Sequence, residues 1–332
     1  MNLIATLTLV VIIVYLLNSF LLSYWKRRGI VQIDPKFLFG DAGSLLTVKK
    51  SIGVFLDDFY KKYKDIPIIG VYMSYLPVLM VHDPQIVQAI LVKDFSSFHD
   101  RPMPVEETKD PLSGHLFNIA GQKWRDLRVK LSPTFTSGKL KGMFPIIRSC
   151  GLVLDEYLVK NVKQGIDVFE FRDLLARYAT NIISSVAFGI ENDCINNPDH
   201  IFRRMGAKFF KTSAKNGIRN ALQFTVPKLF HKLQIKTVDQ DIEDFIFSII
   251  KQNVEYREKT NFTRNDFMQL LIQLKNHGVV SADGAKNEQE DSKSETFRKL
   301  NLGELAAQAF VFFVAGKQIK FFFLVIKMWL SR

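Results

Sequence analysis

The chain has 332 residues, of which 47% are hydrophobic and 23% charged, with a net charge of +12 and a mean hydropathy of +0.05. Two cysteines, Cys150 and Cys194, exclude a disulfide framework and indicate a reducing compartment. No cluster of Lys and Arg is interleaved with stacking aromatics, so we predict no nucleic-acid binding. The length allows one large domain or two ordinary ones, and the basic, apolar composition suits a protein held against an anionic membrane face.

The first predicted element is the uncharged apolar stretch from Leu3 to Trp25. A helix of this length, at about 1.5 Å per residue, crosses a hydrocarbon core of about 30 Å. Two aromatic residues close the stretch and a basic triplet follows at 26–28, which favours a cytoplasmic body. The alternative is a cleaved secretory peptide, but its basic start, shorter apolar run and cleavage site are not evident. We therefore predict that residues 1–25 are an uncleaved membrane anchor.

Hydrophobic periodicity predicts the elements that follow a basic linker and turn-rich stretch at 26–50. We expect an amphipathic helix over 51–64, a β-hairpin over 66–81, and a helix over 85–94 that Asp83 and Pro84 begin. Prolines and Gly114 make residues 98–120 irregular, and long irregular segments in compact domains are often functional.

The second half of the chain is predicted to be almost entirely helical. A helix resumes after Gly121 and ends at Leu131, residues 138–276 are mostly helical, and residues 281–298 form a polar loop. Residues 301–316 are a last, very apolar helix. The fold class is therefore mainly α with a small β element.

Trp124 and Arg128 lie four residues apart, so that they project from one face of the predicted helix. An indole N–H and a guanidinium on one face make a donor pair suited to a carboxylate. The alternative is that Trp124, Leu127 and Leu131 are a core stripe and that Arg128 is solvated. Spacing alone favours this second interpretation.

Five motifs change that balance because they occur in a familiar order: FHDRP at 98–102, DPLSGHLF at 110–117, GQKWRDLRVKLSPTFTSGKLKGMFP at 121–145, ARYATNIISSVAFGIE at 176–191 and ELAAQAFVFFVAG at 304–316. With the anchor, they closely resemble an insect microsomal cytochrome P-450, a haem-thiolate monooxygenase of the detoxification type. The resemblance implies the N-terminal part of the cytochrome P-450 fold, preceded by a single transmembrane helix. It implies a domain over 51–316 that is incomplete.

The resemblance also implies roles for particular residues. Trp124 and Arg128 are expected to hold a propionate of haem b, and Phe117 and Asn118 to face the substrate pocket. Ala315 and Gly316 would leave room for dioxygen above the haem. The helices over 201–233 would roof the pocket, where four phenylalanines contact substrate, belong to the core or dip into the bilayer surface: Phe209, Phe210, Phe224 and Phe230. The expected partners are the endoplasmic reticulum membrane, an NADPH-cytochrome reductase and a lipophilic substrate.

Residues 317–332 depart from the family, which follows Ala-Gly with a variable residue, an acid and a threonine. This chain has Lys317, Gln318 and Ile319 instead. Three lysines make a membrane helix costly, and lysine is rarely fully buried in a core. We interpret 317–332 as a non-homologous tail. Gly316-Lys317 can be encoded GGT-AAG, and GTAAG is a typical splice-donor start, so read-through into an intron explains the tail; sequencing the transcript across this junction tests that.

The axial cysteine of the family lies on a loop near the C-terminus, flanked by Phe, Gly and Arg. Neither Cys150 nor Cys194 has that context, and the ExxR pattern ending at Arg298 precedes the oxygen-binding helix. We therefore expect no iron ligand and no catalytic residue among these residues, and an inactive chain. The alternative to a monooxygenase is a non-catalytic, membrane-anchored truncated isoform or an intron-read-through product.

Overall fold

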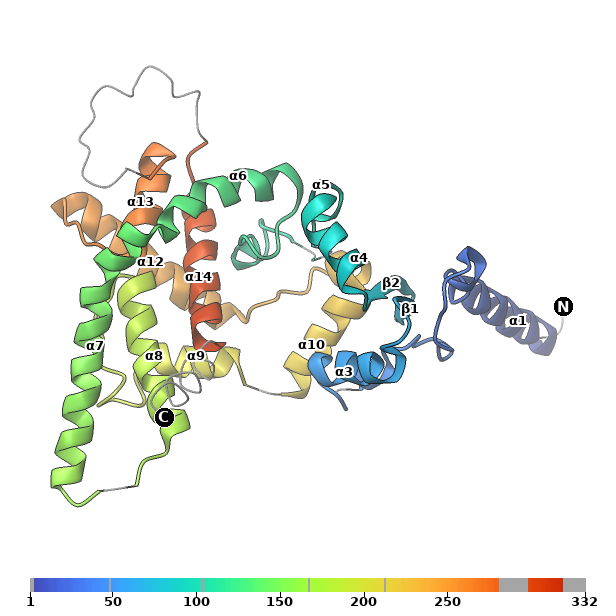
Figure 1. Ribbon diagram of the computed structural model, residues 1–332, viewed down its shortest axis with the longest axis horizontal. Coiled ribbons are helices and arrows are strands. Elements are labelled where there is room, and N and C mark those ends of the chain that lie inside the picture. The colour runs from blue at the N-terminus through green and yellow to red at the C-terminus, as the bar shows by residue number, and fades with distance from the viewer. Residues whose placement is uncertain are drawn as a thin grey trace. The chain divides into compact units, whose positions relative to one another are not determined.

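The computed structural model describes residues 3–47, 49–101, 103, 105–166, 168–211, 213–280 and 298–318. The chain forms two compact units, one of residues 1–104 with 212–237 and one of residues 105–211 with 238–332. Figure 1 labels the elements of both units. Residues 281–297 of the predicted polar loop lie outside the described residues. Residues 319–332 of the predicted tail lie outside them as well.

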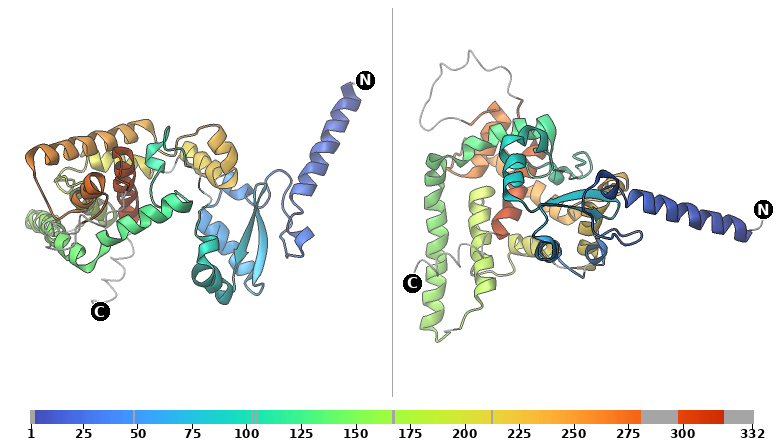
Figure 2. Two further views of the ribbon diagram at one scale, coloured as in Figure 1. Left: turned by 90° about the horizontal axis from the view of Figure 1, so that it is seen from above. Right: turned by 45° about the vertical axis from the view of Figure 1, so that its right-hand side comes forward.

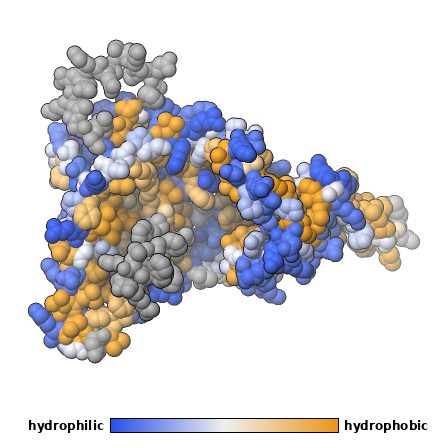
Figure 3. Space-filling view, in the orientation of Figure 1, coloured by the Kyte–Doolittle hydropathy of each residue, from blue (hydrophilic) through white to orange (hydrophobic). Residues whose placement is uncertain are grey.

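The first unit opens with α1 (Leu3–Leu21), a 19-residue helix that is long and apolar enough to cross a membrane. No other described helix meets those limits of length and composition. Figures 2 and 3 show α1 as a straight helix with a largely hydrophobic surface. The prediction of an N-terminal apolar helix is therefore confirmed.

The body of the first unit is a β-hairpin with short helices around it. Strands β1 (Ile68–Met73) and β2 (Leu76–Val81) pair antiparallel, with Gly70 opposite Leu79. The predicted hairpin is thus confirmed. Around it lie η1 (Lys26–Arg28), α2 (Gly43–Leu46), α3 (Ile52–Tyr63), α4 (Pro84–Gln88), η2 (Ala89–Lys93), α5 (Phe95–Phe98), α10 (Ala214–Thr225) and α11 (Pro227–Lys232).

Two helix starts of the first unit agree with the capping residues in the sequence. The Ser51 hydroxyl accepts the Val54 N–H at the start of α3, and the Asp83 carboxylate accepts the N–H groups of Gln85 and Ile86 at the start of α4. The helix predicted over 85–94 is divided, because α4 ends at Gln88 and a π-helical turn, η2, follows. Periodicity does not reveal such a change of winding, because a single π-helical turn of five residues is too short to establish a period of its own.

The second unit is helical. It contains η3 (Pro111–Ser113), α6 (Gly121–Leu131), η4 (Ser132–Phe135), α7 (Ser137–Lys163), α8 (Phe171–Ala187), α9 (Ile201–Phe209), α12 (Gln240–Thr260), α13 (Phe267–His277) and α14 (Leu302–Gln318). The predicted end of a helix at Leu131 and the predicted last helix are confirmed, although α14 begins one residue later and continues two residues further than expected.

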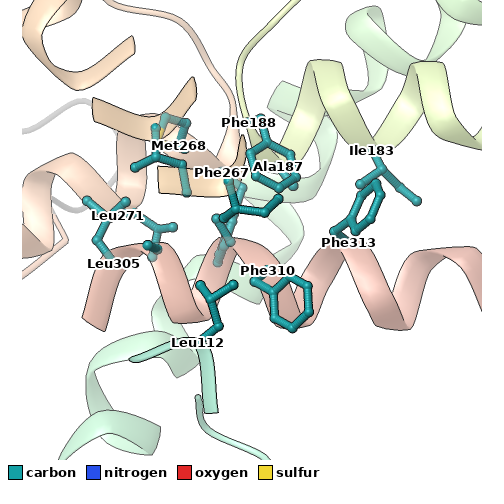
Figure 4. Close-up of a cluster of buried hydrophobic side chains, with 14 of the residues drawn as sticks. Leu112, Ile183, Ala187, Phe188, Phe267, Met268, Leu271, Leu305, Phe310 and Phe313 are labelled. Carbon is teal, nitrogen blue, oxygen red and sulfur yellow. The ribbon is translucent and has the colours of Figure 1, made fainter. Parts of the chain in front are cut away.

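α14 is the centre of this unit. Leu305, Ala306, Ala309 and Phe310 are at most 2% exposed, and α8, α12, α13 and η3 pack around the helix. Figure 4 shows buried side chains gathered at α14, among them Phe313 of α14 itself, Leu112 of η3, Met268 of α13 and Phe188 just after α8. A helix with apolar residues on all sides is stable only when neighbours cover it completely.

One buried ion pair joins α12 to the start of α13. Arg257 donates to both carboxylate oxygens of Asp266, at 2.9 and 2.6 Å, and to Gln269 Oε1 at 3.2 Å. Asp266 also caps α13 by accepting the Gln269 N–H. Gly189, at φ +66°, passes so close that a Cβ there would collide with the Arg257 guanidinium. Both charged side chains are almost completely buried, at 2% and 0% exposure.

We predict that Arg257→Met lowers the free energy of unfolding by about 3–5 kcal/mol, because it removes both hydrogen bonds from a guanidinium to the buried Asp266 carboxylate and leaves only the longer contact with Arg264, at 3.9 Å. Urea unfolding followed by circular dichroism in detergent measures this loss. Arg204→Met is the matched control, since Arg204 is exposed on α9 and should change stability by no more than about 0.5 kcal/mol. Equal losses in both variants would contradict the prediction.

Candidate functional site

The irregular segment before α6 is fixed to α14 by a buried glutamine. Gln308, which is fully buried, accepts the Leu116 N–H at 3.0 Å through Oε1 and donates to the Gly114 carbonyl at 3.3 Å through Nε2. Because both ends of the amide are used by backbone groups, Gln308 sets the distance between α14 and residues 114–116. Sequence reasoning missed this residue; a glutamine inside a run of apolar residues was the available signal.

Phe117 and Asn118, the predicted pocket residues, differ sharply in exposure. Phe117 is 53% exposed, whereas Asn118 is 5% exposed. The Asn118 amide donates to the Ser113 carbonyl at 3.2 Å and lies 3.3 Å from His115 Nε2. Asn118 thus holds the loop together from inside, and contact of either residue with substrate stays a prediction.

His115 is a buried imidazole in the same loop. Burial lowers its pKa to about 4, so the ring is neutral at pH 7. Asn118 is the hydrogen-bond donor to Nε2, and Nδ1 is buried without a hydrogen-bond partner among the described residues. Sequence analysis gave His115 no role, since a single histidine carries no spacing signal.

Trp124 and Arg128 lie on α6 as predicted, four residues apart. Trp124 is half-buried and packs against the core around α14. Arg128 is exposed, and within the described parts of the chain its guanidinium has no hydrogen bond or ion pair. The helix therefore presents an aromatic ring that the core holds in place and, one turn later, a guanidinium available to an acidic ligand.

A charged cluster lies where α6 meets the start of α14. Glu304 accepts from Arg298 at 2.5 Å and lies 3.2 Å from Lys123, which also pairs with Glu107 at 2.5 Å. Asn301 and Glu304 form a reciprocal cap, because each side chain accepts the backbone N–H of the other residue. The Asn-x-x-Glu spacing could have predicted this cap. Arg298, the end of the ExxR pattern, thus belongs to an ion pair at a helix start.

The predicted oxygen groove lies near the end of the described part of α14. Ala315 is exposed, and the helix continues through Gly316 to Gln318. Nothing in the described chain tests a role for these two positions in binding oxygen, so that role stays a prediction.

Both cysteines are buried thiols on other elements. Cys150 lies on α7, where burial raises the pKa of its thiol. Cys194 follows α8, its Sγ donates to Asn192 Oδ1 at 3.3 Å, and burial raises its pKa to about 11. A metal-binding thiolate needs the opposite environment, one that lowers the pKa. Among the described residues, no group of three or more His, Cys, Asp or Glu could hold a metal ion.

Comparison with known proteins gives one family. The family model described as "Cytochrome P450" matches residues 5–318. Cytochrome P450 6A1 of Musca domestica is 39% identical over 89% of this chain, and Cytochrome P450 6a2 of Drosophila melanogaster is 37% identical over 89%. Cytochrome P450 6k1 of Blattella germanica is 35% identical over 93%. The chain spans 55%, 57% and 59% of the lengths of these three relatives.

We predict that His115 makes stability fall as the solution is acidified. The folded imidazole has a pKa of about 4 against an ordinary value of 6.5, so between these values the unfolded chain binds the extra proton. The loss starts below pH 6.5, is complete near pH 4 and amounts to about 3 kcal/mol at most. His115→Gln should remove this part of the pH dependence of unfolding by urea.

His277→Gln is the matched control, because His277 is exposed at the end of α13. It should leave the profile unchanged. A profile that is the same for the parent chain and for His115→Gln would show that the His115 ring is protonated as easily in the folded chain as in the unfolded one.

Proposed function

Because the chain belongs to the cytochrome P450 family, we propose that it is the membrane-anchored, haem-binding part of a monooxygenase that inserts one oxygen atom from O2 into a lipophilic substrate. The observation that carries the proposal is the family match over residues 5–318 together with the donor pair of α6. The family implies haem as the cofactor. When bound, haem with its thiolate ligand supplies the iron chemistry that activates dioxygen.

The residues of α6 suit the carboxylate end of a haem. Arg128 is exposed and unpaired within the described residues, and the core holds the Trp124 ring one turn away. A propionate could accept from both side chains, and a charge-assisted hydrogen bond is about twice as strong as a neutral one. We assign Trp124 and Arg128 to the propionate on this chemistry.

The remaining roles follow from the chain's own side chains. Phe117 offers an exposed aromatic surface to a lipophilic substrate, and Asn118 acts through the loop, which it fixes at Ser113. At Ala315 and Gly316, small side chains would let a diatomic ligand lie against the backbone. Phe209 contacts the Phe310 ring at 5.3 Å between centroids, which favours a core role for it over substrate contact.

We place the protein in the endoplasmic reticulum membrane with its body on the cytoplasmic side. The support is α1, the basic triplet at 26–28 that follows it, and the family of the chain. An NADPH-cytochrome reductase is then the electron donor. We divide the chain into an anchor at 1–25, a linker at 26–50, a family domain at 51–316 and a tail at 317–332.

A second candidate function rests on the two cysteines. Both are buried and both have raised pKa values, which disfavours ligation of iron by either thiol. We propose that these 332 residues alone do not catalyse oxygenation. By themselves they act as an anchored, non-catalytic isoform.

We predict that Arg128→Ala weakens binding of hemin to the purified chain by about tenfold, since a hydrogen bond to a charged group is lost. Quenching of the tryptophan fluorescence of the chain by added hemin, in detergent, measures the affinity; Trp124 is one of three tryptophans that contribute to the signal. Arg125→Ala is the matched control on the same helix, exposed like Arg128 but one residue after Trp124, and should leave the affinity unchanged. Equal effects of the two substitutions would remove Arg128 from the site.

We also predict that the reduced, CO-treated chain with hemin shows no Soret band of the thiolate type. Difference spectroscopy of the full 332-residue chain measures this. A thiolate band that disappears in Cys150→Ser or Cys194→Ser would identify the ligand and overturn the non-catalytic proposal.

A further inference from the structure

The one buried residue of α1 is polar. Asn18 is 7% exposed, whereas the apolar residues around it, such as Leu17 and Phe20, are more than half exposed. Its Oδ1 accepts the Leu38 N–H at 3.0 Å and the Tyr75 hydroxyl at 3.3 Å. The end of α1 is therefore bound to the loop at 36–40 and to the turn between β1 and β2.

Other contacts strengthen this junction. The amide of Gln32 donates to the Leu22 carbonyl at 3.1 Å, just beyond the end of α1, and its Oε1 accepts the Lys26 N–H at 2.9 Å. Leu22, Trp25 and Tyr72 form a small buried cluster between the helix end and the hairpin. These contacts leave little freedom for a hinge directly after α1.

The loop at 36–40, which we call the FLF loop, carries three consecutive large apolar side chains. Phe37, Leu38 and Phe39 are each 44–49% exposed. Leu38 has φ +64°, which is rare for a leucine, and Gly40 has φ +58° with no room for a Cβ beside the Ser74 carbonyl. A strained backbone that keeps apolar side chains exposed indicates a functional constraint.

The backbone of the FLF loop is suited to an apolar solvent. Lys36 O accepts the N–H groups of Phe39 and Gly40, at 3.2 and 2.9 Å, and Asn18 accepts the N–H of Leu38. Polar backbone groups must be satisfied internally in lipid, because no water is present to pair with them. Three consecutive N–H groups, those of Leu38, Phe39 and Gly40, meet this requirement, while the loop presents hydrophobic side chains outward.

The contact with α1 fixes the depth of the FLF loop. The Phe37 ring stacks against Tyr15, with ring centroids 6.3 Å apart. Tyr15 precedes Leu21 by six residues, which is about 9 Å along the helix axis. Interfacial helices insert their apolar face to a depth of about 5–10 Å. A bilayer crossed by α1 therefore surrounds Phe37 as well.

Basic residues lie on the water side of this arrangement. Lys36, at the base of the loop, is exposed, as are Lys26, Arg27 and Arg28 after α1. Arg27 folds back to donate to the Phe20 carbonyl at 2.6 Å, and Arg28 stacks over the Tyr24 ring. Cations at this level match the phosphates of lipid head groups, with their stems along apolar surface.

We propose that the FLF loop inserts into the same membrane leaflet as the end of α1, and that Asn18 fixes loop and helix together so that anchor and hairpin meet the bilayer as one rigid body. The partner is a phospholipid bilayer. The inference rests on the proposed anchoring by α1 and goes beyond it, because anchoring alone requires neither the loop nor Asn18.

The test places an environment-sensitive nitrobenzoxadiazole label on Leu38→Cys of the full chain in phosphatidylcholine vesicles. Nitroxide lipids labelled near the carbonyl or near the chain end report depth by quenching. A second label at Val11→Cys, exposed in the middle of α1, reports anchoring itself. The parent chain gives the background, since Cys150 and Cys194 are buried.

We expect shallow quenching at position 38 and deep quenching at position 11. Deep quenching at 11 without quenching at 38 would overturn insertion of the loop while anchoring stands. The absence of quenching at both positions would overturn the anchoring and the inference together.

The role of Asn18 is tested by Asn18→Leu in the chain labelled at position 38. This change keeps α1 apolar but removes the acceptor for Leu38 and Tyr75, so quenching at 38 should fall about twofold or more, and quenching at 11 should not change. Ser19→Leu is the matched control, because Ser19 is exposed one residue away. Unchanged quenching at 38 in Asn18→Leu would overturn the tether.

Discussion

The second unit depends on covering α14, an apolar helix in which every residue from Glu304 to Phe310 is buried. Leu305, Ala306, Ala307, Ala309 and Phe310 are all at most 2% exposed, so neighbouring elements must approach from every direction. The alanines permit close approach and the phenylalanines fill the remaining space, as the edge-to-face contact between Phe188 and Phe313 shows. Helices α8, α12 and α13 and the segment around η3 are arranged by this requirement.

Burial of α14 also determines which of its polar residues must find hydrogen-bond or ion-pair partners inside the unit. Glu304 and Gln308 lie one turn apart on the helix and are 7% and 0% exposed. Buried polar groups need partners. Glu304 forms ion pairs with Lys123 and Arg298 and caps the start of α14. Gln308 forms hydrogen bonds with the backbone at 114–116. The loop before α6 is held in place from inside the core. Its sequence can therefore position Phe117 at the surface without support from regular structure.

The sequence was informative wherever the physics is local. Caps at Ser51 and Asp83, the hairpin, the helix end at Leu131 and the apolar character of α14 all follow from neighbouring residues. The same-face placement of Trp124 and Arg128 is also local, because helix geometry fixes it. Partners distant in sequence were not predictable. Gln308 meets Leu116 across 192 residues, and Asp266 requires the whole α12–α13 turn to reach Arg257. The different exposure of Phe117 and Asn118 was not predictable either, because an irregular loop has no periodicity that tells which side chains are buried.

The junction after α1 shows why a composition argument can identify an element and still miss its attachment. Mean hydropathy is averaged over many residues of the stretch from Leu3 to Trp25, so one polar residue, Asn18, hardly changes it. Physically, the exception carries information, because an amide in an apolar helix is costly unless it has partners. Those partners, Leu38 and Tyr75, lie in segments that look like linker and turn. A polar residue near the end of a membrane helix thus predicts a neighbouring segment at membrane depth, and here that segment carries Phe37, Leu38 and Phe39.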